Sequence, residues 1–151
     1  MTQPITFITF QEKNFDALLK MSLKLWDDFK PSDLRKLLQQ VSKANNQRII
    51  LAKNSKQVNI GFVIVSIRSD YVEGAKQSPT GYLEGIFVEQ DYRKNGIVKK
   101  LVALGEEWLK AKGCTQIGSD TWISNTASRN FHKQLGFWEE EELVHFLKDI
   151  E

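Results

Sequence analysis

The sequence predicts a single mixed α/β (α+β) domain, on three observations. Apolar residues alternate with a period of two in some segments and recur every three or four residues in others, in the order β, α, α, β, β, β, α, β, α, β. The 151 residues have the length of one domain, and no repeat or Pro/Gly-rich linker divides residues 1–151. The second half alternates strands with helices, which predicts right-handed β-α-β crossings.

The first half begins with a strand over residues 5–10, where apolar side chains alternate with threonine. A helix is predicted from Asn14 to Trp26, because its apolar residues have helical spacing. The segment 27–31 breaks that pattern, and Pro31 suits the first turn of a second helix. The apolar positions of this second helix are Leu34, Leu37, Leu38 and Val41.

Residues 48–53 and 60–68 predict a pair of strands joined by the polar segment 54–59. A long polar loop over residues 69–80 follows. The next strand, residues 81–88, is an apolar run interrupted by one carboxylate and one glycine. If side chains alternate strictly along it, one face carries Tyr82, Glu84, Ile86 and Val88.

Helical periodicity returns at residues 98–112, and Gly113 follows where a helix commonly ends. A short strand over residues 115–119 and a helix over residues 125–135 come next. Residues 137–148 predict a last extended segment.

Bulk properties exclude several classes of protein. Lys and Arg number 21 against 19 Asp and Glu, a net charge of +2 that argues against nucleic-acid binding. The N-terminus lacks the features of a signal peptide, and no run approaches the roughly 20 apolar residues that span a bilayer, so we expect a soluble, cytoplasmic protein with no membrane partner. Cys114, the sole cysteine, and the two histidines, His132 and His145, are too scattered to predict a metal site.

A polar turn over residues 89–95 joins the strand 81–88 to the long helix. Free N–H groups in the first turn of a helix, together with the helix dipole, bind phosphate. Gly96 allows a pyrophosphate to approach the backbone, and Arg93 and Lys94 add positive charge. The same pattern also fits an ordinary βα turn with a solvated basic face.

This turn resembles the Q/R-x-x-G-x-G/A motif of the GNAT acetyltransferases, with Arg93 and Gly96 in place and Val98 where the family has Gly or Ala. The run Asn125-x-x-Ser-x-x-Phe131-His132-x-x-x-Gly-Phe resembles the second GNAT motif, so the resemblance extends over nearly the whole chain. It implies the GNAT acetyltransferase fold: a central, mostly antiparallel sheet flanked by about four helices, with the fourth and fifth strands splayed into a cofactor cleft.

The resemblance also implies acetyl-CoA as co-substrate. In the second motif the Asn contacts the pantetheine arm, and His132 lies near the thiol. The cofactor-binding residues implied in this way are Ile86, Phe87, Val88, Arg93, Lys94, Asn95, Gly96, Ile97, Val98 and Asn125.

Three segments and a tripeptide are similar to the aminoglycoside 6′-N-acetyltransferases: Leu25-Trp26, residues 66–74, residues 82–88, and Ser119-Asp120-Thr121. The resemblance implies acetylation of the 6′-amino group of aminoglycosides and thereby antibiotic resistance. Aminoglycosides are polycations, so their cleft needs carboxylates and aromatic walls. Glu84 and Asp120 would supply the carboxylates, and Trp26 and Tyr71 would flank the sugar rings.

Direct attack of the amine on the thioester in a ternary complex requires a neutral amine. Glu84 or Asp120 would take its proton, directly or through water, and His132 would serve the departing sulfur. Each residue has a structural alternative: Glu84 in a salt bridge to Arg68, Asp120 as a loop or capping residue, Trp26 as a core aromatic, and His132 as a packed surface residue. At the level of function, the alternatives are acetylation of a polyamine, amino acid or protein N-terminus, or a non-catalytic acyl-CoA-binding module.

Residues 137–150 contain no Gly, Pro or Asn, the residues that a tight hairpin usually needs. They predict one long strand at a sheet margin, with Leu143, Phe146 and Leu147 uncovered. Pairing with a second copy would cover them, so we expect a homodimer through this C-terminal strand. The alternative is a monomer whose acidic residues 139–142 protect the edge.

Overall fold

The computed structural model describes residues 4–150, so the first three residues and Glu151 of the domain predicted over residues 1–151 lie outside it. The elements alternate along the chain much as the sequence predicts. In order they are β1 (Thr6–Thr9), the 3₁₀ turn η1 (Glu12–Asn14), α1 (Phe15–Leu25), α2 (Pro31–Lys43), β2 (Gln47–Lys53), β3 (Asn59–Arg68), β4 (Thr80–Val88), the 3₁₀ turn η2 (Gln90–Tyr92), α3 (Ile97–Ala111), β5 (Ile117–Gly118) and α4 (Thr126–Gln134).

The strands form one sheet in the order β1-β2-β3-β4-β5. Neighbours pair antiparallel up to β4, and β4 and β5 pair in parallel across the connecting helix α3. The parallel pairing consists of Gly81 with Ile117 and Tyr82 with Gly118. Beyond Tyr82 the two strands separate, and this confirms the predicted mostly antiparallel sheet with a splay between its fourth and fifth strands.

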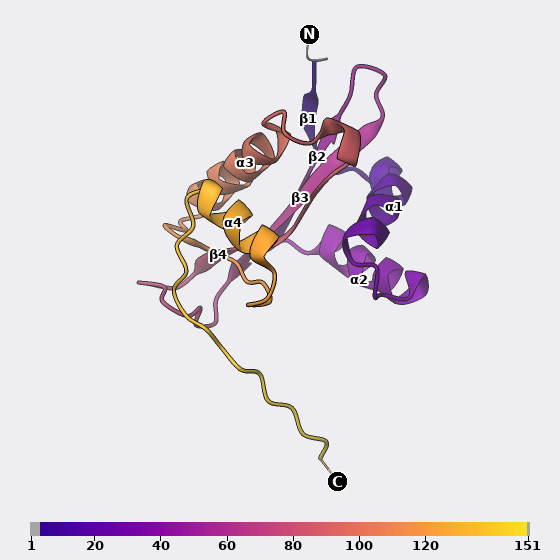
Figure 1. The fold of residues 1–151 in the computed structure, drawn as a ribbon. Helices are drawn as coiled ribbons and strands as arrows, with labels where there is room; N and C mark the ends of the chain where they lie inside the picture. The colour runs from indigo at the N-terminus through magenta and orange to yellow at the C-terminus, as the bar shows by residue number, and fades with distance from the viewer. Residues whose placement is uncertain (1–3, 151) are drawn as a thin grey trace.

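Helices cover both faces of the sheet (Figure 1), with α3 and α4 on one side and α1 and α2 on the other. Two apolar clusters fill the layers between. On the α3 side the buried residues include Val63, Leu83 and Leu101, and on the α1–α2 side they include Leu18, Leu34 and Phe62. The helical apolar stripes seen in the sequence therefore face the sheet, as their spacing predicts.

Local signals in the sequence set the ends of three helices. Pro31 stands in the first turn of α2. Gly96, at φ +78°, precedes α3, and Gly113, at φ +92°, follows it. The side chain of Asn125 caps α4 by accepting a hydrogen bond from the amide of Ser128 at 3.0 Å.

Strict alternation along β4 is wrong. The register places Ile64 opposite Gly85 but Val65 opposite Leu83, so β4 has one extra residue at Glu84. Such a bulge turns the following side chains to the other face. Ile86 and Val88 consequently pack in the α3-side cluster and do not share a face with Glu84.

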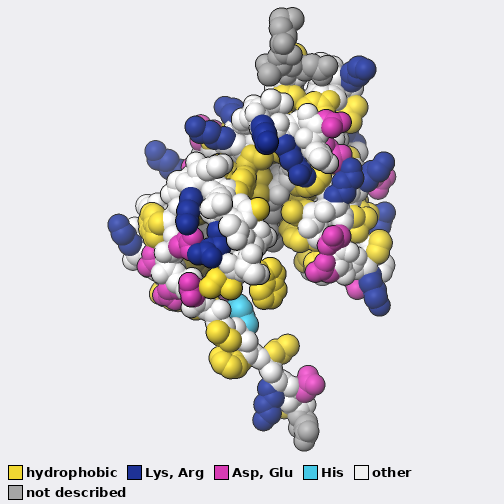
Figure 2. Space-filling model, in the orientation of Figure 1, with side chains coloured by type: hydrophobic (Ala, Val, Ile, Leu, Met, Phe, Trp, Pro, Cys, Tyr) yellow, Lys and Arg dark blue, Asp and Glu magenta, His cyan; other side chains and the backbone are white. Residues whose placement is uncertain are grey.

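The predicted C-terminal strand is also wrong for the single chain. No strand is assigned within the described residues after β5, and residues 138–150 are exposed. The segment leaves the body of the molecule as an extended tail with hydrophobic side chains uncovered (Figures 1 and 2). A strand needs a partner for its backbone groups, and the tail has none among residues 4–150.

Candidate functional site

Glu84 lies on the α1–α2 face of β4 and is held by two residues of β3. Its carboxylate forms an ion pair with Arg68 at 2.6 Å and accepts a hydrogen bond from the Ser66 hydroxyl at 3.2 Å. This is the structural alternative weighed for Glu84. The two side chains are 43% and 26% exposed, so water screens the pair, and such pairs contribute only about 0–1 kcal/mol. This ion pair therefore contributes little net stability to the fold.

Asp120 follows the neighbouring strand β5 and is linked to Glu84 through Tyr82 and Arg68. It accepts a hydrogen bond from the Tyr82 hydroxyl, two residues before Glu84. Burial, reinforced by Asp120, raises the pKa of Tyr82 well above its ordinary range, so the phenol stays protonated and donates to the carboxylate. The Arg68 guanidinium lies over the Tyr82 ring, 3.3 Å from its centroid. One cation and one phenol thus join the two carboxylates.

Trp26, directly after α1, extends this cluster. A Cβ built on Gly85 would lie 2.7 Å from the Trp26 ring, so the indole packs directly on the backbone beside Glu84. Its ring also contacts Phe62, with centroids 6.2 Å apart. Trp26 therefore belongs both to the core and to the wall of the carboxylate cluster.

Tyr71 is not part of this cluster. Its side chain is 75% exposed on the loop between β3 and β4, and its hydroxyl accepts a hydrogen bond from the amide of Gly74 at 3.2 Å. Glu140 of the tail lies against the same loop at Gly74. The loop thus contacts the tail at Gly74 and β5's flank at Lys76, whose amide donates to the Gln116 side chain at 2.8 Å.

The turn that leads from the other end of β4 into α3 has free backbone amides. The first hydrogen bond of α3 runs from the amide of Lys100 to the carbonyl of Gly96, at 3.1 Å. The amides of Ile97, Val98 and Lys99 therefore have no helical acceptor, and no side chain caps them. Lys94, Asn95 and Gly96 are exposed beside them. Unbonded amides at the positive end of a helix form an anion site.

The residues that lead into this turn are tied to the strand. Arg93 donates from Nε to the carbonyl of Val88 at 2.8 Å, and its guanidinium lies 5.7 Å from the Phe87 ring centroid. The Val98 side chain packs against the α3-side core, so its bulk is directed away from solvent. Ile86 packs in the same layer as Val98.

His132 of α4 lies on the α3–α4 side, against the end of β5. Its Nε2 is 2.7 Å from the Ser119 hydroxyl, and Nδ1 is 2.7 Å from the carbonyl of Ser128. Ser119 and Asp120 are consecutive, so the hydrogen-bond partner of His132 adjoins a member of the carboxylate cluster in the chain. Asn125, predicted to bind cofactor, is exposed at the start of the same helix, where its Oδ1 serves as the cap.

Pattern reasoning from the sequence did not assign roles to Ser119 and Tyr82. Both stand next to a charged candidate, Ser119 beside Asp120 and Tyr82 two residues before Glu84. Their partners, His132 and Asp120, are 13 and 38 residues away. Only the folded chain reveals such pairs.

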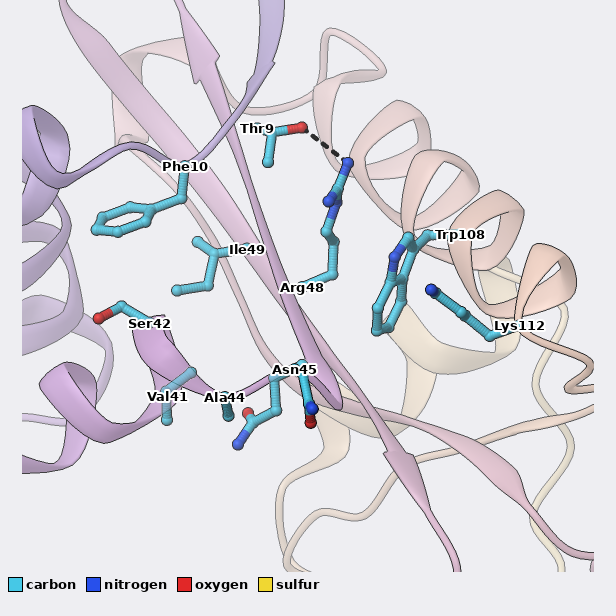
Figure 3. A pocket seen from close by; sticks show the side chains of 11 residues that line it. Thr9, Phe10, Val41, Ser42, Ala44, Asn45, Arg48, Ile49, Trp108 and Lys112 are labelled. Carbon is cyan, nitrogen blue, oxygen red and sulfur yellow. Dashed lines mark hydrogen bonds between the residues drawn. The ribbon is translucent and has the colours of Figure 1, made fainter.

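One pocket lies away from these residues. It has a volume of about 320 Å³ and lies among the ends of α2 and α3 and the strands β1 and β2 (Figure 3). Arg48, Trp108 and Lys112 line it, and Arg48 donates to the Thr9 hydroxyl at 3.1 Å. It shares no residue with the carboxylate cluster or the α3 turn. Figure 2 shows a hollow between the α1–α2 and α3–α4 sides, where hydrophobic side chains gather. This hollow fits the cleft expected between the splayed strands better than the pocket does.

The described residues 4–150 contain neither a membrane-spanning helix nor a metal-binding cluster. No helix among them is long and apolar enough to cross a membrane. In the same range, no three His, Cys, Asp or Glu residues are grouped so as to hold a metal ion.

Comparisons with known proteins agree with this geometry. Residues 15–137 match the acetyltransferase (GNAT) family. A curated aminoglycoside N(6′)-acetyltransferase type 1 from Serratia marcescens is 34% identical over 91% of this chain and 94% of its own length. A protein of the same description from Acinetobacter genomosp. 13 is 39% identical over 83% of this chain and 86% of its own.

Solved structures give the same result. The aminoglycoside antibiotic 6′-N-acetyltransferase of Acinetobacter baumannii superposes with a TM-score of 0.91 at 34% identity, covering 98% of this chain and all of that one. AAC(6′)-Iy, solved with the bisubstrate analogue CoA-S-monomethyl-acetylneamine, has a TM-score of 0.90 at 31% identity, covering 97% of this chain and 99% of its own.

Proposed function

The chain belongs to the acetyltransferase (GNAT) family, and from this premise we propose that it transfers the acetyl group of acetyl-CoA to the 6′-amino group of aminoglycosides, which confers resistance to these antibiotics. The observation that carries the proposal is the pair of carboxylates, Glu84 and Asp120, at the point where β4 and β5 separate. The two carboxylates can bind the ammonium groups of an aminoglycoside, and the uncapped turn before α3 can bind the pyrophosphate of acetyl-CoA.

Acetyl-CoA would lie on the α3–α4 side of the splay. The amides of Ile97, Val98 and Lys99 would bind its pyrophosphate, with Arg93, Lys94 and Asn95 around the turn and Gly96 leaving the backbone accessible. Beyond Tyr82, β4 has no pairing with β5, so the backbone groups of Ile86, Phe87 and Val88 on that side, apart from the Val88 carbonyl that Arg93 occupies, would be available to the pantetheine arm and to the thioester carbonyl. Asn125 would meet the arm from α4.

The aminoglycoside would enter from the α1–α2 side. Trp26 would stack against a sugar ring, and Tyr71 would close over it from the exposed loop between β3 and β4. An ammonium group of the substrate would replace Arg68 at Glu84, because that ion pair is partly exposed and weak. Glu84 is thus best suited to anchoring the substrate.

Asp120 is best suited to accepting the proton. It is exposed, and one oxygen is already fixed by Tyr82, so the carboxylate is oriented but still open to substrate. The ammonium group loses one proton to Asp120, directly or through water. The neutral nitrogen attacks the thioester carbonyl, and the N–C bond forms as the nitrogen releases its second proton to water. The C–S bond breaks with its electron pair going to sulfur. His132 lies on the side of the leaving thiolate.

Two substitutions and a substrate panel test this assignment. Glu84→Gln and Asp120→Asn should each reduce kcat/KM for kanamycin-type and gentamicin-type substrates by about 10²–10⁴-fold. Acetyl-CoA affinity, measured by calorimetry, should stay nearly unchanged. Wild-type kcat/KM in both variants would refute the site, and turnover with polyamines or peptides but not with aminoglycosides would refute the substrate class. Cofactor binding without turnover of any amine would indicate an acyl-CoA-binding module.

We also infer that the protein works as a cytoplasmic homodimer joined through residues 137–150. Cytoplasm supplies the acetyl-CoA. The start of the tail is anchored, since Glu139 contacts Arg129 and Lys133 at 2.6 and 2.8 Å. Farther along, Phe146 and Leu147 are 90% and 101% exposed on backbone that has no strand partner. A second copy would cover both the side chains and the backbone.

Light scattering at micromolar concentration measures the assembly directly. We expect twice the mass of the chain for the wild type and a monomer for a Phe146→Ser, Leu147→Ser double variant. A control outside this segment, Val58→Ser, alters an exposed apolar side chain between β2 and β3 and should keep the dimer. A monomeric wild type would rule the dimer out.

A further inference from the structure

The His132 ring is fixed on four sides. Nδ1 lies 2.7 Å from the Ser128 carbonyl oxygen and Nε2 lies 2.7 Å from the Ser119 hydroxyl oxygen. The rings of Phe131 and Phe137 meet it edge to face, with centroids 5.6 and 5.2 Å away. A histidine at the surface of a helix needs none of these contacts, so the ring is held in a defined orientation.

These contacts determine which nitrogen carries a proton. A carbonyl oxygen only accepts hydrogen bonds, so Nδ1 must donate to Ser128. The Ser128 hydroxyl also lies near Nδ1, but at 3.3 Å it is the weaker partner. If Nδ1 were unprotonated, its lone pair would face the carbonyl oxygen at 2.7 Å. Nδ1 is therefore protonated in both the neutral and the charged ring, and Nε2 is the nitrogen that gains or loses a proton.

The Ser119 hydroxyl is the hydrogen-bond partner of Nε2. Ser119 follows β5 and precedes Asp120, and side chains in an extended segment alternate between faces. Asp120 accordingly meets Tyr82 of β4, whereas Ser119 meets His132 of α4. With Nδ1 occupied and both Phe rings packed against the imidazole, the route from Nε2 to another molecule passes through the Ser119 hydroxyl.

We propose that Ser119 is the catalytic residue that protonates the departing thiolate, and that His132 supplies the proton through it. This inference rests on the proposed acetyl transfer. In the charged state His132 donates from Nε2 to the Ser119 oxygen, which frees the hydroxyl hydrogen to point at the sulfur. When the C–S bond breaks, the electron pair goes to sulfur, sulfur takes the hydroxyl proton, and Ser119 recovers a proton from Nε2. His132 becomes neutral and regains its proton from solvent between turnovers.

The kinetic test uses Ser119→Ala, Ser119→Thr and His132→Gln, with Ser42→Ala as matched control. Ser42 is a half-buried serine on α2, and its hydroxyl donates to the Gln39 carbonyl at 3.0 Å. Ser119→Ala and His132→Gln should lower kcat by about 10²-fold or more, with both KM values nearly unchanged. Ser119→Thr retains the hydroxyl and should recover most of the rate. Thermal unfolding of each variant confirms that it is folded.

A spectroscopic test needs no turnover. In protein carrying ¹⁵N-labelled histidine, the neutral His132 ring should hold its proton on Nδ1, and Ser119→Ala should shift the Nε2 resonance, since Nε2 loses its hydrogen-bond donor. His145, exposed in the tail, serves as internal reference and should not move.

The outcomes distinguish a failure of the proposed acetyl transfer from a failure of the relay, that is, of proton transfer from His132 through Ser119 to sulfur. A wild type that acetylates no amine overturns the proposed function and the relay together. An active wild type whose Ser119→Ala variant keeps its kcat overturns the relay alone. A neutral His132 protonated on Nε2 also overturns the relay, whatever the activity.

Discussion

Replacing Gly96 by leucine should weaken acetyl-CoA binding much more than it lowers the stability of the fold. The residue before α3 has φ +78°, a conformation that costs an L-residue about 1–2 kcal/mol. No heavy atom lies within 4 Å of a Cβ built there, so backbone strain is the cost to folding and no clash adds to it. At about 2–4 °C for each kcal/mol, we expect Tm to fall by about 2–8 °C.

The effect on acetyl-CoA should be larger. The leucine side chain would occupy the open space beside the amides of Ile97, Val98 and Lys99 and obstruct a phosphate there. Loss of one hydrogen bond to a charged group removes about 1.5–3 kcal/mol. Since about 1.4 kcal/mol is a factor of ten, KM for acetyl-CoA should rise roughly 10- to 100-fold, while kcat at saturating cofactor changes little.

Gly113→Leu provides the matched control. This glycine follows the other end of α3 at φ +92°, also with no heavy atom within 4 Å of a built Cβ. It should lower Tm by a similar amount and leave KM for acetyl-CoA unchanged in steady-state assays. Equal KM increases in the two variants, or none in Gly96→Leu, would refute the assignment of the pyrophosphate to this turn.

Three further predictions follow from single contacts. Gly85→Ala places a Cβ 2.7 Å from the Trp26 ring, so it should raise KM for the aminoglycoside but not for acetyl-CoA; equal changes in both constants would contradict the role of Trp26. Leu101→Ala, at a fully buried position, should destabilise the fold by about 2–5 kcal/mol in urea titrations without changing either KM, and a loss below about 1 kcal/mol would argue against this core. Arg129, and then Lys133, hold the pKa of Glu139 at about 2, below its ordinary 4.5, so the stabilisation by this carboxylate is complete above pH 4.5 and is lost as pH falls towards 2. The difference in Tm between wild type and Glu139→Gln should therefore be constant at neutral pH and vanish near pH 2. A difference that grows as the pH falls would contradict the ion pairs of Glu139 with Arg129 and Lys133.

The sequence determined the elements of this protein because their signals are local. Apolar spacing predicts the helices near their observed bounds, and Pro31 and Gly113 mark a helix start and a helix end through their own backbone preferences. The turn at Gly96 was predictable for the same reason, since strand, glycine and helix are adjacent in the chain. The family resemblance rests on such contiguous motifs.

Tertiary structure decided what depends on residues far apart. The bulge at Glu84 arises from pairing with β3, and it moves Ile86 and Val88 to the face opposite the one that a period of two predicts. Glu84 meets Arg68, Asp120 meets Tyr82, and Ser119 meets His132 across separations of 16, 38 and 13 residues, which no local pattern encodes. The tail has strand-like composition but no strand, because a strand exists only where another backbone satisfies its hydrogen bonds.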